Sequence, residues 1–439
     1  MKKYIYPLIF YIISYLTVHL HAKLTEVTPG GLQSAINLAT EEDTLVLHTG
    51  DYDETITIPK ALTLIPMLNA KVFITGDLTI SNTLKKTVLR DLNFGGKLSI
   101  ENSVDIVVDD CSMKGDVVIE NTKFRFHNSN FAGDINIGEG STTLITKCVI
   151  GGAVNSTDTA RTFTLLQSEV NGLVVARSLR KWICYNSINN GLYLFNGESY
   201  AVGNTVDVNS NSDNFFLFKG RKDKNKLSSY QDYVDTNIYL TKDSFGLYNT
   251  KFQVLNNTIN SLQAASSEGI VFNNKLQSLT VQNNFKVRFD GKYQHGGNLG
   301  LHPDTLTAID QHLILLGIGK DNGWISIQGN SIGDLTAQYA KVYAGYNSIT
   351  TFTGGVVPLK SVTLSETETG VDLGPPEPEF NDHDGTRNDI GIQGGHSYDP
   401  NGWDTDKPIV LMNKLDVQYV KKGTSTIRLN TRGATALTK

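Results

Sequence analysis

One arrangement of apolar and polar positions recurs along most of the chain. Each copy begins with two apolar residues separated by one variable residue. Two further residues follow, then a Cys, Ser or Asn, one variable residue and a last apolar residue. The clearest copies centre on these small polar residues: Cys111, Ser129, Ser168, Asn257, Asn330 and Asn347. Alternation with a period of two is typical of β-strands, and the two residues before the polar position interrupt it. The pattern therefore predicts short strands joined by tight corners.

The copies follow one another at a nearly constant interval. The small polar position recurs at 111, 129, 148, 168, 186 and 204, in steps of 18, 19, 20, 18 and 18 residues. A repeat of this length without a helical period predicts a solenoid whose coils stack on one another. The Cys, Ser and Asn side chains would then form an internal ladder, in which buried polar groups hydrogen-bond to the next coil.

This repeat resembles that of the pectin lyase-like family over about residues 30 to 360. The resemblance implies an all-β fold, a right-handed parallel β-helix solenoid with an N-terminal helical cap and a small C-terminal β extension. Leu32, Ala35, Ile36 and Ala39 share one face of a helix. A short helix there would cover the first coil and protect its open edge.

The two ends of the chain depart from the repeat. Residues 1–22 run from basic to apolar to small side chains, the order of a signal peptide, with an uncleaved membrane anchor as the alternative. We expect the parallel β-helix over residues 23–372, a proline-rich acidic linker with an Asp/Gly-rich closing motif over 373–395, and a small β extension or cap over 396–439. The mature chain would be secreted or displayed at the cell surface, without a transmembrane span.

Two adjacent carboxylates stand directly before one ladder position. Asp109 and Asp110 precede Cys111 and resemble the paired carboxylates of polygalacturonases. In the repeat, however, they occupy the two-residue corner, which is usually polar, and no Asn-Thr-Asp, Gly-His-Gly or Arg-Ile-Lys segment accompanies them. We therefore expect a solvent-exposed corner, with Cys111 as one rung of the ladder.

The three cysteines fit the same scheme. Cys111 and Cys148 lie two coils apart in one column, on the order of 9.5 Å from the strand spacing, which is too far for a disulfide. Cys184 falls in a corner two coils beyond Cys148. We expect three free thiols, with structural burial as the role of the first two.

The repeat is interrupted twice, over 53 residues between Asn204 and Asn257 and over 56 residues between Asn274 and Asn330. We interpret both intervals as insertions, which often carry the function of a solenoid. The first, about residues 207–250, combines basic groups that pair with carboxylates or phosphates and aromatic faces that stack on sugar rings. A solvated loop whose aromatic residues pack on the scaffold is the alternative. The candidate ligand-binding residues are Lys219, Arg221, Lys222, Tyr230 and Tyr233.

The second insertion, about residues 287–322, contains Arg288, Lys292, His295 and His302. In β-helix polysaccharide lyases a Lys or Arg abstracts the proton beside a uronate carboxylate. Arg288 and Lys292 are therefore candidate catalytic bases by analogy, with a structural role as the alternative. The two histidines lack a third group at metal-ligand spacing.

The sequence "NDHDGTRNDIGIQGG" resembles the closing signature that often follows bacterial β-helix repeats. Asp382, Asp384 and Asp389 would supply the oxygen ligands that calcium prefers. A turn held by Asx hydrogen bonds and an Arg387 ion pair explains the same residues without a metal. Further on, "KPIVLMNKLDVQYVKKGTSTIRLNT" alternates over two stretches, which predicts two strands around a Lys-Lys-Gly turn.

Composition narrows the functional classes. The 439-residue chain has a formal net charge of −5, which argues against a general nucleic-acid binder. We expect an exported or cell-surface scaffold that binds polysaccharide or another surface partner without catalysis. A polysaccharide lyase or glycoside hydrolase acting on an acidic glycan is the alternative, and a purely structural role also fits. The sequence leaves these open, because β-helices serve all of them.

Overall fold

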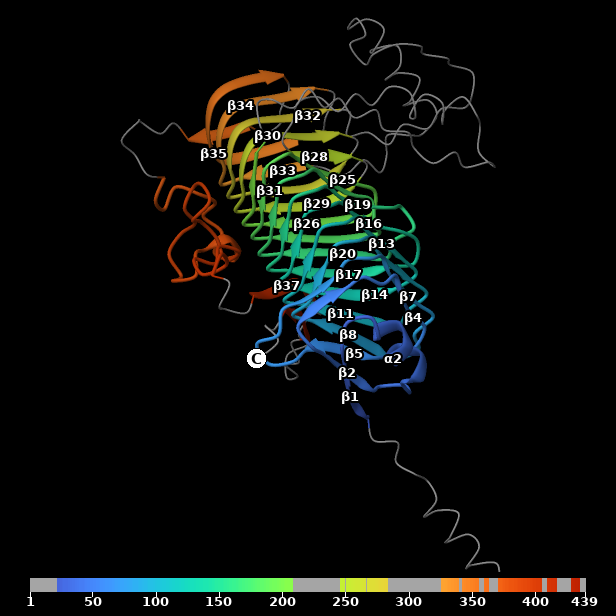
Figure 1. The fold of residues 1–439 in the computed structure, drawn as a ribbon. Helices are drawn as coiled ribbons and strands as arrows, with labels where there is room; N and C mark the ends of the chain where they lie inside the picture. Colours follow the sequence, from blue (N-terminus) through green and yellow to red (C-terminus); the bar gives the residue numbers. More distant parts are fainter. Residues whose placement is uncertain are drawn as a thin grey trace, which may run out of the picture. The chain divides into compact units, whose positions relative to one another are not determined.

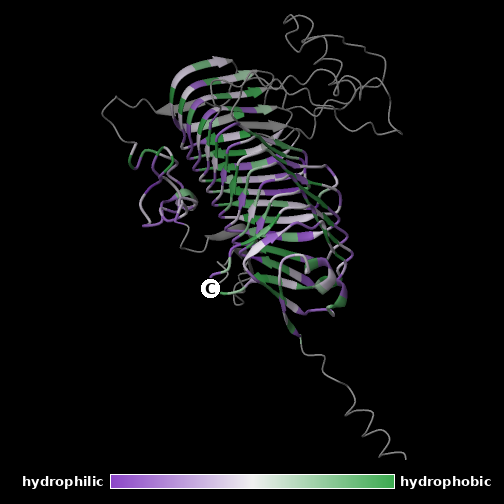
Figure 2. Ribbon diagram, in the orientation of Figure 1, coloured by the Kyte–Doolittle hydropathy of each residue, from purple (hydrophilic) through white to green (hydrophobic). Residues whose placement is uncertain are grey.

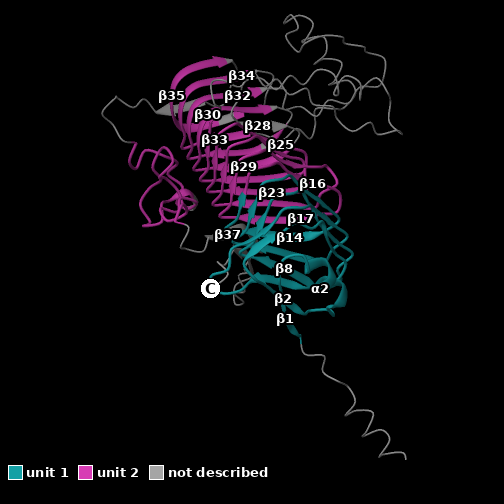
Figure 3. Cartoon of the chain, in the orientation of Figure 1, with its two compact units in different colours: residues 1–130 teal, residues 131–439 magenta. Residues whose placement is uncertain are grey.

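The chain forms two compact units, residues 1–130 and 131–439 (Figure 3). The structure is a computed structural model. It describes residues 22–207, 245–248, 250–265, 267–282, 325–338, 342–354, 359–362, 370–404, 409–416 and 428–434.

Unit 1 is built from three stacks of parallel strands, so that each coil of the chain contributes one strand to each stack. The first stack contains β1 (Leu24–Val27), β2 (Thr44–Leu47), β5 (Thr63–Pro66), β8 (Lys86–Arg90), β11 (Asp105–Asp109) and β14 (Lys123–His127). The second contains β3 (Gly50–Tyr52), β6 (Val72–Ile74), β9 (Asn93–Phe94) and β12 (Ser112–Met113). The third contains β4 (Ile56–Ile58), β7 (Leu78–Ser81), β10 (Leu98–Glu101) and β13 (Val117–Glu120).

Unit 2 repeats this plan, and β15 (Asn130–Phe131) lies at the boundary between the units in sequence. The stack that leads into the ladder contains β17 (Thr142–Thr146), β20 (Thr162–Leu166), β23 (Arg180–Cys184), β26 (Glu198–Val202), β29 (Lys251–Leu255), β31 (Glu268–Phe272), β33 (Ile325–Gln328) and β35 (Val342–Gly354). The stack after the ladder contains β18 (Val149–Ile150), β21 (Glu169–Val170), β24 (Ser187–Ile188) and β27 (Thr205–Val206). The third contains β16 (Ile135–Ile137), β19 (Val154–Ser156), β22 (Val174–Ala176), β25 (Leu192–Phe195) and β28 (Phe245–Tyr248). The longer β30 (Thr258–Ala265), β32 (Lys275–Gln282) and β34 (Ser331–Gln338) continue both of these last two stacks, and β36 (Leu359–Val362) pairs with β35.

The alternation in sequence becomes an alternation between the core and the outer surface. In β8, Thr87 and Leu89 are buried, whereas Lys86 and Arg90 are exposed. Hydrophobic and hydrophilic residues accordingly alternate along the strands (Figure 2). Side chains of successive strand residues point to opposite faces, so each coil adds its inward residues to a continuous apolar column. The predicted parallel β-solenoid is confirmed.

A short helix, α2 (Leu32–Leu38), follows β1 in unit 1. Leu32 and Ile36 are fully buried, as the predicted helical face requires, and the helix contacts β1 and β4. The Glu54 carboxylate accepts hydrogen bonds from the backbone N–H groups of Leu32 and Gln33, both at 3.0 Å. These bonds satisfy donors that a helix N-terminus leaves unpaired. The helix exists where the sequence predicts it, while its capping role and the handedness of the solenoid stay predictions.

The predicted internal ladder is present in unit 2. The backbone N–H of each asparagine donates to the side-chain oxygen of the next one, for example from Asn204 to Asn257 at 2.8 Å and from Asn274 to Asn330 at 2.8 Å. The rungs from Asn186 to Asn347 are each 0–1% exposed, so these bonds satisfy polar groups that water does not reach. The complete series is Asn186, Asn204, Asn257, Asn274, Asn330 and Asn347.

The corner before each rung has a left-handed backbone. The second residue of the corner has a φ between 45° and 66° in each coil whose rung is one of the Cys, Ser or Asn residues from Cys111 to Asn347. Asn, Asp and Gly adopt this conformation most readily and fill six of these ten corners, so the left-handed backbone accounts for part of their polarity. The expected solvent exposure is confirmed for Asp110 but wrong for Asp109, which is 5% exposed. The left-handed corner residues are Asp110 and Asn128 in unit 1, and Lys147, Gln167, Tyr185, Gly203, Asn256, Asn273, Gly329 and Tyr346 in unit 2.

Near the C-terminus, β37 (Ile409–Asp416) pairs antiparallel with β38 (Arg428–Ala434). This confirms the two strands predicted there, while their role as a cap stays a prediction. Among the described residues, no helix is long and apolar enough to span a membrane.

Candidate functional site

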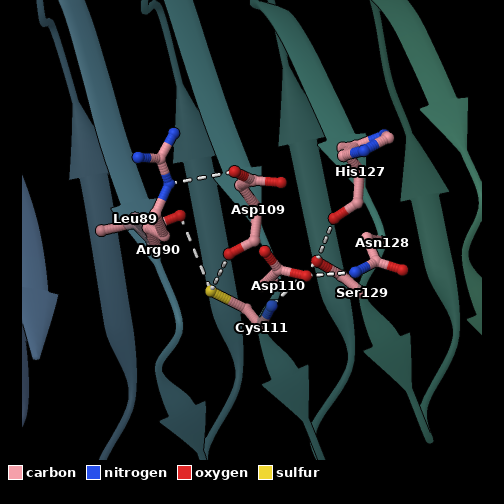
Figure 4. A network of polar contacts seen from close by, with 8 residues as sticks. All are labelled: Leu89, Arg90, Asp109, Asp110, Cys111, His127, Asn128 and Ser129. Carbon is pink, nitrogen blue, oxygen red and sulfur yellow. Dashed lines mark hydrogen bonds and ion pairs between the residues drawn. The ribbon is translucent and has the colours of Figure 1, made fainter. Parts of the chain in front are cut away.

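The adjacent carboxylates Asp109 and Asp110 point in different directions (Figure 4). Asp109 ends β11, and its Oδ2 lies 3.0 Å from Arg90 Nε on the neighbouring strand β8. The Asp109 side chain is 8% exposed and that of Arg90 is 52% exposed. Asp110 is the left-handed corner residue, and its Oδ1 accepts a hydrogen bond from Asn128 Nδ2 one coil further on.

Cys111 is a rung of the ladder, as predicted. Its backbone N–H donates to Ser129 Oγ at 3.0 Å, and its Sγ lies 3.3 Å from Asp109 O. Burial raises the pKa of the Cys111 thiol to about 12, so the thiolate needed for nucleophilic chemistry is absent near neutral pH. The three cysteines are free and buried, in agreement with the predicted thiols.

Glycoside hydrolysis needs two carboxyl groups that flank one scissile bond, with one of them able to deliver a proton. Asp109 is instead committed to a partly buried ion pair, and Asp110 is bonded to its corner neighbour. The arrangement ties adjacent coils together, which supports the scaffold interpretation of this segment.

The two interruptions of the repeat are insertions into single coils, as predicted. Asn204 is bonded directly to Asn257 and Asn274 directly to Asn330, although 53 and 56 residues separate them. The undescribed stretch 208–244 immediately precedes β28, and the undescribed stretch 283–324 immediately follows β32. Because β28, β30 and β32 are hydrogen-bonded neighbours, both insertions join one sheet of unit 2, from opposite ends of its strands.

The outer surface of this sheet carries small and uncharged polar residues at its described positions. Ser261 and Ser278 pair with each other, as do Gln263 and Thr280, and the residue that follows each of them is buried in the core. Gln263 itself is only 5% exposed. On the following strand, Asp334 is paired with Ser278 and is exposed. A second exposed carboxylate, Asp207, follows β27 directly before the first insertion and accepts a hydrogen bond from Asn260 of β30.

The candidate binding and catalytic residues of the insertions lie outside the described residues. These are Lys219, Arg221, Lys222, Tyr230 and Tyr233 in the first insertion, and Arg288 and Lys292 in the second. Their roles stay predictions. What the structure adds is the sheet to which both segments are joined.

Residues 370–404, which we call the strap, lie along the left-handed corners of unit 2 (Figure 1, orange). Later strap residues meet earlier coils, so the strap runs back along the solenoid. Arg387 lies over the ring of Tyr346 at 5.8 Å, and Gly391 N–H donates to Gly329 O at 2.7 Å. Further contacts are Asn256 Nδ2 to Ile392 O and Gly394 O, Trp403 edge-on to Tyr185, and Gln167 Nε2 to Gly402 O and Asp404 O.

The strap packs beside an apolar cluster on the outside of unit 2. The cluster contains Leu166, Trp182, Cys184, Tyr185, Val202, Leu255 and Phe272, and Phe380 of the strap packs against it. Cys184 is fully buried there, and its burial raises the pKa of the thiol well above its usual value. The predicted corner position of Cys184 is confirmed, but the sequence reasoning gave no role to its burial. A signal was present, because the residues that end these strands are apolar, whereas β8, β11 and β14 of unit 1 end in Arg90, Asp109 and His127.

Strap glycines allow this close approach. A side-chain carbon on Gly402 would lie 2.0 Å from Tyr185 Cε1, and one on Gly394 would lie 2.7 Å from Asn273 Nδ2. Real side chains do not approach so closely, so the glycine-rich closing motif fits the strap against the corners.

The three predicted calcium ligands all lie in the strap, and each makes local hydrogen bonds. Asp382 Oδ1 accepts from Gly395 N–H, Asp384 Oδ1 accepts from Thr386 N–H and Oγ1–H, and Asp389 Oδ1 accepts from Asp372 N–H. Within the described ranges, no three His, Cys, Asp or Glu side chains form a group that could hold a metal ion. Arg387 donates to Gly374 O, so the predicted Arg387 ion pair is replaced by a backbone contact and the stacking on Tyr346.

The strand pairing defines the protein as a parallel β-solenoid. No family model matches the chain, and no curated protein matches it. Among solved structures, it is similar to the crystal structure of pectate lyase Pel9A, with 11% sequence identity and a TM-score of 0.29. The similarity covers 86% of this chain and 98% of that chain. At these values the likeness carries no argument about activity.

Proposed function

We propose that this chain is an exported or cell-surface β-helix scaffold that binds polysaccharide without catalysis. The observation that carries the proposal is that both insertions join one sheet of unit 2, next to a surface of Ser, Thr and Gln. Hydroxyl and amide groups pair with sugar hydroxyls, and the basic and aromatic residues predicted to bind ligand belong to the segment that enters β28.

Two features favour binding over catalysis. The adjacent carboxylates of unit 1 are used within the scaffold, and Asp207, the carboxylate that directly precedes the first insertion, is bonded to Asn260. Export is proposed from the signal-peptide pattern of residues 1–22. The three free cysteines do not bear on it, because an exported protein does not require a disulfide.

The alternative is a polysaccharide lyase acting on an acidic glycan. It is favoured by the position of the second insertion, which follows β32 directly and contains the candidate bases Arg288 and Lys292. A lyase leaves an unsaturated uronate, whereas a binding scaffold leaves its ligand intact, so one experiment separates the two.

The test is a screen of the purified mature chain against immobilised neutral and acidic polysaccharides, with absorbance of unsaturated uronate followed in parallel. We expect retention without new absorbance. The triple variant Lys219→Ser, Arg221→Ser and Lys222→Ser should lose at least tenfold in affinity. The matched control is Lys86→Ser with Lys123→Ser, which removes two exposed lysines from unit 1 and should leave retention unchanged.

New uronate absorbance that disappears in Arg288→Ala or Lys292→Ala would establish the lyase and overturn the binding scaffold. Absence of both retention and new absorbance on every polysaccharide would overturn both and leave a purely structural role.

A further inference from the structure

One large aromatic side chain of the strap is exposed to solvent. Trp403 is 47% exposed, and it alone is exposed among the aromatic residues whose side-chain burial the structure describes. By contrast, Trp182 on the solenoid is 9% exposed. A single exposed apolar residue needs no explanation by itself. What distinguishes Trp403 is how firmly the structure holds it in this position.

The backbone on both sides of Trp403 is fixed. Gln167 Nε2, from the corner after β20, donates to Gly402 O at 3.0 Å and to Asp404 O at 2.8 Å. Two further bonds, donated by the N–H groups of Gly402 and Asp404, close the turn 399–404 internally. One side chain of the solenoid therefore clamps the carbonyls that flank Trp403.

The indole ring is also oriented. It lies against the ring of Tyr185, with the centroids 6.5 Å apart and the planes at 84°. Tyr185 is 5% exposed and is itself held between the strap and the next coil, because side-chain carbons on Gly402 or Gly203 would lie 2.0 Å and 2.4 Å from its Cε1. A perpendicular contact of this kind covers at most one face of the indole, which leaves the other face to a ligand.

The turn around Trp403 suits a neutral sugar. The face of an aromatic ring stacks on a sugar ring, while amides and carboxylates pair with its hydroxyl groups. Asn401 of the turn is exposed, and Asp399 and Asp404 are partly exposed. The turn has these two carboxylates and no basic residue, so the like charge of a uronate would be repelled.

We propose that Trp403 is a stacking platform for a neutral sugar ring, with the polar side chains of the turn on the hydroxyl groups of that sugar. The inference rests on the proposed function and adds a ligand class and a second site to it, on the strap. Because the clamp by Gln167 and the contact with Tyr185 fix Trp403 in advance, binding costs little conformational entropy.

The test is titration of the full mature chain with neutral oligosaccharides of glucose, mannose and xylose, and with oligogalacturonate, read by calorimetry and by tryptophan fluorescence. We expect at least one neutral oligosaccharide to bind with a change in fluorescence, and oligogalacturonate to leave this signal unchanged. Trp403→Ala should weaken binding about tenfold or more, and Trp403→Phe should weaken it less, because a smaller ring still stacks. The matched control Leu179→Ala removes a residue of unit 2 that is 59% exposed and should change the affinity by less than about twofold.

Docking of the strap is checked in every variant by the protection of Cys184 from a thiol reagent. If Trp403→Ala undocks the strap, the wild-type chain decides: bound sugar should shield from acrylamide a fluorescence component that Trp403→Phe lacks. Retention on neutral polysaccharides that Trp403→Ala leaves unchanged would overturn this site and leave the proposed function standing, as would retention on acidic polysaccharides alone. Absence of retention on every polysaccharide would overturn both.

Discussion

Removing one asparagine from the ladder should destabilise unit 2 strongly. Asn257 Nδ2 donates to Ala201 O at 3.1 Å, Leu255 O at 2.8 Å and Asn274 Oδ1 at 2.9 Å. Its Oδ1 accepts from the backbone N–H of Asn204 at 2.8 Å and from Asn204 Nδ2 at 2.9 Å. The substitution Asn257→Ala removes all five contacts at a position that is 0% exposed.

The expected cost follows from the partners left behind. A buried donor or acceptor that loses its partner costs about 1–3 kcal/mol, and the losses in one network are not additive. We therefore expect the free energy of unfolding to fall by about 3–5 kcal/mol. Asn257→Ser should cost less, because serine fills the same position at Ser168, where its Oγ accepts from the backbone N–H of Cys148.

The measurement is urea unfolding followed by circular dichroism, with the wild-type chain and Asn189→Ala as references. Asn189 donates to Asn171 Oδ1 at 2.8 Å in an exposed pair, so its loss should cost no more than about 0.5 kcal/mol. A cost below about 1 kcal/mol for Asn257→Ala would refute the reasoning, because the ladder would then contribute no more than surface hydrogen bonds do.

Three further changes test other parts of the structure. Gly402→Ala should displace the strap, because the new Cβ would lie 2.0 Å from Tyr185 Cε1. Cys184, which is fully buried in the wild-type chain, should then react with a thiol reagent, and a Cys184 that stays equally protected would contradict this. Burial lowers the pKa of Lys181 from 10.5 in the unfolded chain to about 7 in the folded chain. Between these two pH values the unfolded chain binds more protons than the folded chain, so the free energy of unfolding should rise with pH. Lys181→Met should flatten that slope by up to about 1.4 kcal/mol per pH unit in urea unfolding, and an unchanged slope would contradict it. Asp109→Asn should lower the unfolding free energy by about 1 kcal/mol or less, and by less still in high salt, since its partner is half exposed.

The solenoid itself could be predicted from the sequence because its signals are local. Every coil repeats the same alternation, and a period-two pattern with a small polar residue at a fixed offset predicts both the strand and the rung. The ladder bonds between Asn204 and Asn257, and between Asn274 and Asn330, confirm that the long intervals hold insertions.

The corners show where local reasoning falls short. The sequence shows that they are polar, but polarity follows either from exposure or from a left-handed backbone. Asp109 is buried against Arg90, and Asp110 has a φ of 52°. At Asp110 both explanations apply, because this residue is exposed and left-handed, whereas exposure fails for Asp109; only the tertiary structure shows this.

The strap shows the same limit over a longer distance. Its motif is recognisable in sequence, but the contacts of Gly402 with Tyr185 and of Gly395 with Asn273 join positions that no periodicity relates. The sequence alone determined the stacking of coils, the ladder and the free cysteines, because each coil contains the same local pattern of apolar and small polar residues. Only the tertiary structure decided that the closing motif lies along the corners, with Phe380 against the apolar cluster that contains Cys184 and Gly402 against Tyr185, because packing between distant segments depends on shape and not on sequence period.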